Sequence, residues 1–242
     1  CNPAWSRAGR KSLGRAMPAS ARPKRSVFPP AKKATAFSSS SSPRMAVPLV
    51  TMPKQPEPAS SALRAASTNR LLLGEVKTAF GAADYTDADL RLPLFDEDVE
   101  IADGIPPKVQ LLADQVKAAD GIVICTPEYN KMIPGVLKNA LDWVSRIKDE
   151  EAIAVPVYKT RVFALGSASP GALGGIRSLS AIRCVLELGL GALVLPDQIA
   201  VPKAHEAFDE HGHLKDKGAQ EKFKAIIQRL AHAAKIMRSE PA

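Results

Sequence analysis

The 242-residue chain is predicted to be an α/β protein, in which a doubly wound parallel sheet is covered by helices on both faces. Two observations predict this fold class. From Thr68 onward, segments with apolar residues at helical spacing alternate with short segments rich in β-branched residues. Two of the short segments, "GIVICT" and "RVFALGSA", are continuous apolar runs of the length of strands buried on both faces. Alternation of this kind is typical of a parallel sheet.

The first elements follow from local patterns. "MAVPLVTM", Met45 to Met52, is the candidate for the first, central strand, although Pro48 lies in its middle and proline is poorly tolerated in a central strand. "NRLLLGEVKTAFG" is predicted to be a helix with Ser67 or Thr68 as its N-cap. "DADLRLPLFDED" is predicted to be a short strand that leads into a proline loop, and "PPKVQLLADQVKAAD" a helix.

The later elements continue the alternation. The strand "GIVICT" is followed by a predicted helix from Pro134 to Lys148, whose apolar residues form a broad side. "RVFALGSA" is the next strand, "GGIRSLSAIRCVLELG" the next helix and "GALVLP" the last strand. A helix from Gln220 to Met237, with apolar residues at helical spacing, completes the prediction.

Charge is unevenly distributed along the chain. Residues 1 to 55 contain eleven Lys or Arg and no Asp or Glu, whereas the remainder contains 22 basic and 25 acidic residues. The formal net charge of +8 therefore does not indicate nucleic-acid binding. Residues 1 to 58, rich in Arg, Ser, Ala and Pro, are predicted to be a disordered basic leader, and residues 59 to 242 the folded domain. This composition is typical of an organelle transit peptide, which predicts a chloroplast location, with mitochondrion or cytoplasm as alternatives.

Other sequence features argue against several kinds of site. No apolar run approaches the roughly 18 residues of a membrane span, so none is predicted. Cys1, Cys125 and Cys184 share no metal-like spacing, and Cys125 and Cys184 are predicted to act as small hydrophobes. No metal site is predicted.

Three segments occupy positions beyond the carboxyl ends of strands, where ligands bind in open α/β sheets. "SSALRAASTNR" offers hydroxyl groups, Arg64 and a helix N-terminus, a combination suited to a phosphate. "TPEYNKMIPG" places a proline turn after a buried strand, and the amides of Glu128 to Asn130 would suit a flat ring that gains negative charge. "GSASPGALGG" lets the backbone approach a ligand. The structural alternatives are a helix cap, an ordinary strand-to-helix connection and a flexible loop.

At these residues the chain resembles the NADPH-dependent FMN reductase family, a flavodoxin-like group that includes bacterial chromate and quinone reductases. The resemblance is most specific at "PEYNKMIPGVLKNALDWVSR" and continues over "GSASPGALGGIRSLSAIRCVLELGLGALVLP". It implies a five-stranded sheet of order 2-1-3-4-5, non-covalently bound FMN, NADPH or NADH as electron donor, and a quinone-type acceptor reduced by hydride transfer through flavin N5. Because the flavin carries this chemistry, no catalytic side chain is implied.

The resemblance also implies which residues bind the cofactor. They form the phosphate loop, the turn that holds the isoalloxazine ring, and the loop that closes the other side of the flavin. In this order they are Arg64, Ser67 and Asn69; Pro127, Glu128, Tyr129 and Asn130; and Ser167 and Gly171.

A homodimer or homotetramer is implied as well, with the helix at residues 134–147 as the subunit interface. Leu137, Ala140, Leu141 and Trp143 match the interface residues of the family. This agrees with the broad apolar side of the helix, which one sheet face alone would not fully cover.

The chain departs from the family pattern at two places. Ala62 lacks a hydroxyl that is expected to meet the phosphate, and Met132 replaces the Ser or Gly common after the turn. A hydrogen bond to a charged group contributes about 1.5 to 3 kcal/mol, so a lower FMN affinity is expected. The alternative function is therefore an oligomeric flavodoxin-like scaffold that has lost FMN binding through a degraded phosphate loop and is not an enzyme.

Overall fold

The structure, a computed structural model, describes residues 44–46, 67–81, 83–148 and 156–239. Every described residue lies in one compact unit, residues 40–242. Its first strand, at residues 44–46, belongs to the segment assigned to the leader, so this unit begins before residue 59. The rest of the predicted leader lies outside the described residues.

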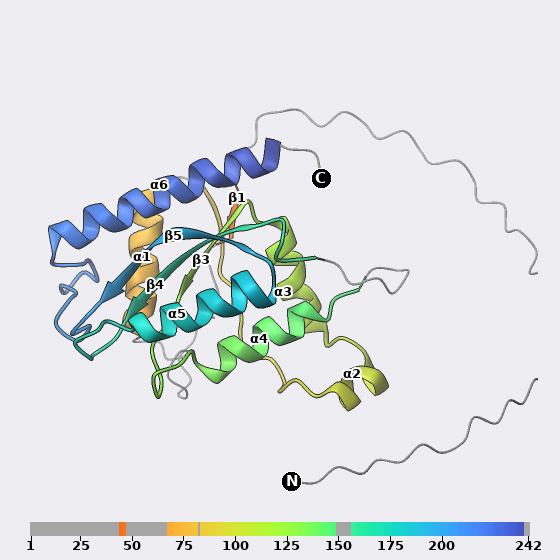
Figure 1. Cartoon of the computed structure of the whole chain (residues 1–242). Coiled ribbons are helices and arrows are strands. Elements are labelled where there is room, and N and C mark those ends of the chain that lie inside the picture. Colours follow the sequence, from red (N-terminus) through yellow and green to blue (C-terminus); the bar gives the residue numbers. More distant parts are fainter. Residues whose placement is uncertain (1–43, 47–66, 82, 149–155, 240–242) are drawn as a thin grey trace, which may run out of the picture. The chain divides into compact units, whose positions relative to one another are not determined.

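Parallel strands form one sheet in the order β2-β1-β3-β4-β5, which is the order that the resemblance implied (Figure 1). The strands are β1 (Arg44–Ala46), β2 (Asp84–Thr86), β3 (Gly121–Cys125), β4 (Val162–Ala168) and β5 (Leu193–Val201). The parallel sheet and the α/β class are therefore confirmed.

Helices connect the strands on both faces of the sheet. They are α1 (Thr68–Phe80), α2 (Glu97–Asp103), α3 (Pro107–Ala118), α4 (Gly135–Ser145), α5 (Ile176–Cys184), the short π-helix η1 (Val185–Gly189) and α6 (Lys217–Ser239). None of the helices in the described residues is long and apolar enough to cross a membrane.

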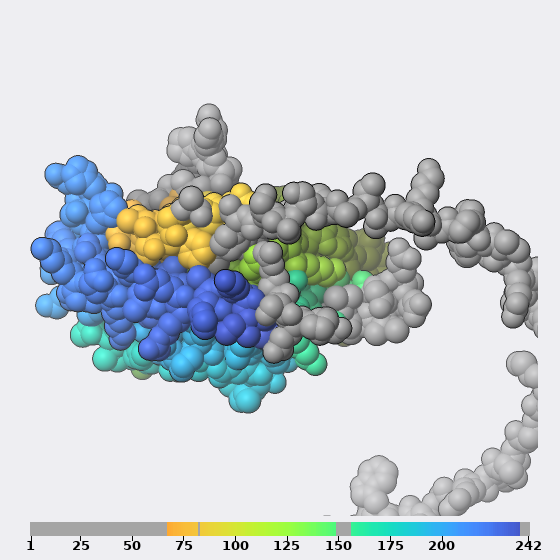
Figure 2. All heavy atoms as spheres, turned by 90° about the horizontal axis from the view of Figure 1, so that it is seen from above, coloured from red at the N-terminus to blue at the C-terminus, as the bar shows by residue number. Residues whose placement is uncertain are grey.

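Side chains that alternate along β3 divide the core into two clusters. Ile122 and Ile124 pack with α3, α4 and α5 on one face. Val123 and Cys125 pack with α1 and α6 on the other, where Figure 2 shows the orange α1 beside the blue α6. Because every residue of β3 is buried, its continuous apolar run is explained by helices on both sides.

The segment from Asp87 to Asp96 is not the strand that was predicted. The nearest strand is β2, immediately before it, and the segment itself has no regular secondary structure. Ala88 and Leu90 are nevertheless buried, with the exposed Asp89 between them, because the segment packs against the core cluster of α3 and α4. The alternation of apolar and polar residues here therefore belongs to a half-buried loop. The helix α2 that follows, with Asp96 as its N-cap, was not predicted from the sequence.

A proline lies within or close to each of the two other strands whose bounds differ from the prediction. β1 ends two residues before Pro48, and residues 47–52 of the predicted strand lie outside the described part of the chain. β5 continues through Pro196, where the register against β4 shifts between Phe163 and Leu165. An edge strand can accommodate this because the missing N–H need not face a neighbouring strand.

The two described cysteines differ. Cys125 lies fully buried in the core and burial raises the pKa of its thiol, so it acts as the predicted small hydrophobe. Cys184 is exposed at the end of α5, so that prediction was wrong for this residue.

Candidate functional site

The carboxyl ends of β3 and β4 bring together the three segments that sequence analysis selected. The N–H of Thr126, just after β3, donates to the carbonyl oxygen of Gly166 in β4 at 2.9 Å. The side chain of Asn69, in the first turn of α1, bonds to the backbone of Ala168 at the end of β4. One edge of the sheet therefore holds the start of α1, the turn after β3 and the glycine loop after β4.

The turn after β3 is a tight hairpin. The N–H of Tyr129 donates to Met132 and the N–H of Met132 donates to Tyr129, both at 2.9 Å. Asn130 and Lys131 between them have positive φ angles of 50° and 69°, as in the two-residue turns that match strand twist. Residues 128–130 were predicted to present free backbone amides. This prediction was wrong for Tyr129, whose N–H is bonded within the hairpin.

The residues of this turn, backbone and side chain taken together, differ in exposure. Pro127 is buried, Glu128 and Tyr129 are half-buried, and Asn130 is exposed. Tyr129 is thus partly accessible. The backbone beyond the buried proline projects from the sheet edge, where a flat ligand could contact it.

Glu128 joins the turn to the start of α5. Its carboxylate accepts from Nε of Arg177 at 2.7 Å and from the backbone N–H of Arg177 at 3.2 Å. Its side chain is only 7% exposed, whereas that of Arg177 is 47% exposed. The hydrogen bond from Arg177 is the main cause that lowers the pKa of the Glu128 carboxyl, so this carboxyl is ionised at neutral pH.

The side chain of Asn69 does not reach outward from α1. Its Nδ2 donates to the carbonyl oxygen of Ala168, and its Oδ1 accepts from the N–H of Ala168, each at 2.8 Å. The residue is 1% exposed. Asn69 therefore fixes the first turn of α1 to the end of β4, and only its backbone N–H is left for a ligand.

Of the other two residues predicted to form a phosphate loop, the structure describes one. Ser67 is the N-cap of α1, with an extended backbone and no side-chain capping bond. The backbone N–H groups of Thr68 and Asn69 lie in the first turn of the helix, where N–H groups have no partner within the helix. Arg64 lies outside the described residues.

The loop after β4 comes very close to neighbouring chain segments. Gly174 and Gly175 have φ angles of 59° and 88°. A Cβ on Gly174 would lie 2.7 Å from the backbone of Val201, and one on Gly175 would lie 1.9 Å from Oγ of Ser167. Both positions therefore need glycine, for conformation and for space.

Ser167 and Gly171, the two predicted residues of this loop, have opposite environments. Ser167 is fully buried at the end of β4, and within the described part of the chain its Oγ has no hydrogen-bond partner. Gly171 is exposed, and a Cβ there would meet open space. A ligand can therefore approach the backbone at Gly171, whereas Ser167 lies beneath the loop.

Arg177 was missed by sequence analysis. It stands in the first turn of α5, near the positive end of the helix dipole, where a cation is disfavoured unless an anion accompanies it. A basic residue at a helix start, after a glycine that offers no capping side chain, was the available signal for an acidic partner. Glu128, 49 residues earlier, is that partner.

The predicted interface residues of α4 are buried within their own chain. Leu137, Ala140, Leu141 and Trp143 are at most 3% exposed. Trp143 donates from Nε1 to the carbonyl oxygen of Pro93 at 2.8 Å and meets the Phe95 ring edge-on at 5.0 Å between centroids. The segment before α2 thus covers the apolar side that was expected to need a second subunit.

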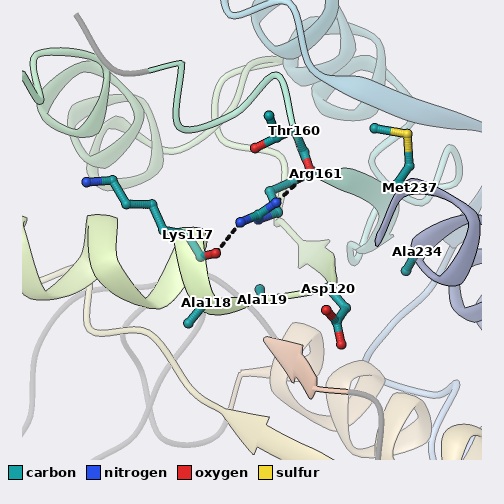
Figure 3. A pocket seen from close by; sticks show the side chains of 8 residues that line it. All are labelled: Lys117, Ala118, Ala119, Asp120, Thr160, Arg161, Ala234 and Met237. Carbon is teal, nitrogen blue, oxygen red and sulfur yellow. Dashed lines mark hydrogen bonds between the residues drawn. The ribbon is translucent and has the colours of Figure 1, made fainter. Parts of the chain in front are cut away.

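A cavity of about 140 Å³ lies at the other end of the sheet, beside the starts of β3 and β4 (Figure 3). Arg161 projects into it and donates to the carbonyl oxygens of Val116, Lys117 and Thr160. Figure 3 shows its guanidinium turned toward Lys117. The arginine therefore satisfies carbonyls at the end of α3 and is separate from the candidate site.

Comparison with known proteins places this geometry in a family. Residues 60–206 match the model of the NADPH-dependent FMN reductase family. A quinone reductase of Escherichia coli is 42% identical over 104 residues, which cover 43% of this chain and 52% of that protein. The chain thus aligns with about half the length of this relative. An NAD(P)H-dependent FMN reductase of Pseudomonas aeruginosa is 37% identical over 140 residues, covering 57% of this chain and 71% of that protein.

A solved structure supports the fold. The flavoenzyme FerB of Paracoccus denitrificans, an NAD(P)H:(acceptor) oxidoreductase, superposes with a TM-score of 0.62 at 21% identity, covering 81% of this chain and 98% of that one. At this identity the likeness concerns the fold, whereas the matched family model spans more than half of the chain. The chain belongs to the NADPH-dependent FMN reductase family.

Proposed function

We propose that the protein is an FMN-dependent NAD(P)H oxidoreductase that passes two electrons to a quinone-type acceptor. When bound, FMN would supply the chemistry, taking a hydride at N5 and delivering it to the acceptor. The observation that carries the proposal is the meeting of the Tyr129–Met132 hairpin, the glycine loop at Gly171 and the start of α1 at one sheet edge. The names of the relatives agree with it.

The residues at this edge fit a flavin. Helix α1 starts without a side-chain cap, which leaves backbone N–H groups and a positive dipole end for a phosphate. Gly171 has open space above it, so a ring can approach its backbone closely. The accessible part of Tyr129 offers an apolar surface beside the turn.

Roles follow for the predicted residues. Ser67, Arg64 and the backbone N–H of Asn69 would hold the phosphate, and Pro127 to Asn130 would line one side of the ring. Gly171 would line the other side. Ser167, being buried, would support the loop from below.

The test is FMN titration of the purified full chain, followed by NADPH oxidation with benzoquinone as acceptor. Saturable quenching of flavin fluorescence and quinone-dependent turnover are expected. Tyr129→Ala should weaken FMN binding about two- to tenfold, the range expected for loss of an aromatic contact of about 0.5 to 1.5 kcal/mol. Tyr85→Phe, in β2, is the matched control. A chain that takes up no FMN would favour the scaffold alternative, which Ala62 suggests.

We also propose that the protein forms oligomers through residues 134–147, but through the polar side of this helix and not through its apolar side. The exposed side of α4 is polar and includes Lys138, which is paired with Asp142, and Ser145. A contact through this helix would therefore be polar. Light scattering should give a dimer or tetramer, and Lys138→Glu should shift it toward the monomer; an unchanged mass would move the contact elsewhere.

The leader is proposed to direct import into chloroplasts. Its support is the composition of residues 1 to 58, basic and rich in serine with a single acid at Glu57. Residues 1–58 fused to a fluorescent protein should be imported by isolated chloroplasts and processed to a shorter form. Import only by mitochondria, or by neither organelle, would reject the chloroplast location.

A further inference from the structure

We propose that Arg177 is a positioning residue: its ion pair with Glu128 fixes the hairpin after β3 against the start of α5. This inference rests on the proposed function for its effect on FMN, while its structural part can be tested in the protein without cofactor. It concerns a residue of α5 that lies outside the three segments selected from the sequence.

Helix α5 cannot cap its own N-terminus. Its N-cap is Gly175, with φ of 88°, which has no side chain. No other residue fits, because a Cβ would lie 1.9 Å from Oγ of Ser167. The N–H of Ile176 donates to the carbonyl oxygen of Leu173 at 3.1 Å, so the N–H groups that follow need an acceptor from elsewhere in the chain.

Glu128 supplies this acceptor. One carboxylate oxygen accepts the backbone N–H of Arg177 at 3.2 Å, and the other accepts Nε of the Arg177 guanidinium at 2.7 Å. The second terminal nitrogen of the guanidinium also contacts the carboxylate. A nearly buried carboxylate is thus held by one residue through both its backbone and its side chain, with the helix dipole adding to the attraction.

The pair is the second of two tethers that flank Pro127. The first is the hydrogen bond from the N–H of Thr126 to Gly166. Glu128 comes directly before the hairpin, so its bond to Arg177 sets the direction in which Tyr129 to Met132 leave the sheet edge. Loss of this tether alone should let the hairpin pivot while β3 and β4 stay paired.

The charge of the pair also matters for a ring beside the turn. In the unaltered protein, the opposite charges of Arg177 and Glu128 cancel, so the ion pair adds no net charge beside the hairpin. Arg177→Met leaves the Glu128 carboxylate alone, which should lower the reduction potential of a flavin, because reduction adds negative charge. Glu128→Gln leaves the guanidinium alone and should raise the potential. Mere loosening of the site would not produce opposite shifts.

Hydrogen exchange is the first test, measured by NMR on the full chain without FMN. In Arg177→Met the amides of Tyr129 and Met132 should exchange about tenfold faster, as expected for loss of about 1.4 kcal/mol of local stability. Amides of β3 should keep their rates. Arg177→Lys, which retains the charge, should restore part of the protection.

The control is Arg229→Met in α6, where an exposed arginine is likewise paired with a carboxylate, that of Asp197. It should leave the exchange of Tyr129 and Met132 unchanged. If Arg177→Met does not fold, the same measurement on Glu128→Gln decides. Unchanged exchange at both amides in every folded variant of the pair overturns the inference.

The second test follows FMN in the same variants. Weaker binding in Arg177→Met, with flavin potentials shifted in opposite directions in Arg177→Met and Glu128→Gln, is expected. Shifts in the same direction, or none, would overturn the placement of the pair beside the ring. If the unaltered chain binds no FMN, the proposed function fails, while the exchange measurement still decides whether Arg177 positions the hairpin.

Discussion

Asn69 and Ala168, 99 residues apart in sequence, are joined by a reciprocal pair of hydrogen bonds. The side-chain amide of Asn69 donates to the carbonyl oxygen of Ala168 and accepts from its N–H, each at 2.8 Å, in a buried environment. This pairing completes the backbone hydrogen bonding of β4 at its carboxyl end with a side chain of α1. The start of α1 and the end of β4, two parts of the candidate site, are thereby held in one geometry.

Removing the Asn69 amide should destabilise the fold. Asn69→Ala leaves the N–H and the carbonyl oxygen of Ala168 unpaired, and each buried unpaired group costs about 1 to 3 kcal/mol. A decrease of about 2 to 5 kcal/mol in the free energy of unfolding is expected by urea denaturation. Gln110→Ala, which removes an exposed amide bonded to Asp114 in α3, should change it by less than about 0.5 kcal/mol. Equal effects of the two substitutions would contradict this prediction.

Lys131 should be better replaced by glycine. Its φ of 69° lies in the left-handed region, which costs a side-chain-bearing residue about 1 to 2 kcal/mol. Glycine loses more chain entropy on folding, which offsets part of the gain. Lys131→Gly should therefore raise the free energy of unfolding by up to about 1 kcal/mol, whereas Lys138→Gly within α4 should lower it by about 1 kcal/mol. Destabilisation by Lys131→Gly would count against the hairpin geometry.

Two glycines of the loop after β4 should differ sharply in how much stability is lost when alanine replaces them. Gly175→Ala combines a left-handed backbone with a Cβ 1.9 Å from Oγ of Ser167, so a loss of about 2 to 5 kcal/mol is expected. Gly171→Ala meets open space and should stay within about 0.5 kcal/mol of the unaltered chain. Thermal unfolding of both variants is the measurement. If Gly175→Ala is as stable as Gly171→Ala, the close approach of this loop is wrong.

The ion pair of Glu128 should make stability depend on pH. Its hydrogen bond with Arg177 lowers the pKa of the carboxyl in the folded protein. The folded state therefore binds this proton more weakly than the unfolded chain, whose glutamate pKa is about 4.3. The stabilisation is fully present above that value and is lost as pH falls through the lower folded pKa.

The measurement compares the unaltered chain with Glu128→Gln in urea from pH 7 downward. The difference in unfolding free energy should be largest near neutral pH and should shrink below about pH 4, where the unfolded glutamate is protonated. A difference that stays constant down to about pH 2 would show that the pair does not stabilise through its charge.

Much of the fold could be predicted because it depends on local periodicity. The run from Gly121 to Cys125 is apolar throughout and became a strand buried on both faces. The helical spacing from Thr68 to Phe80 became α1. The prediction was wrong at residues 87–96, since alternation along an extended loop on a helix layer looks the same as alternation along a strand.

The sequence predicted correctly that the three segments of the candidate site meet at one sheet edge, but not the roles of several residues. Asn69 was assigned to the phosphate loop, yet its side chain is committed to Ala168. Tyr129 was expected to offer its amide, yet the hairpin with Met132 uses it. Trp143 was assigned to a subunit contact, yet Pro93 and Phe95 cover it.

By itself, the sequence determined the α/β class, the strands that end at the site and the turn at Pro127 to Asn130, because these depend on residues that are neighbours along the chain. Only the tertiary structure decided that Glu128 caps α5 through Arg177 and that Asn69 closes the end of β4. Those contacts join residues 49 and 99 positions apart. They exist because the strand order β1-β3-β4 places three separate connections at one edge of the sheet.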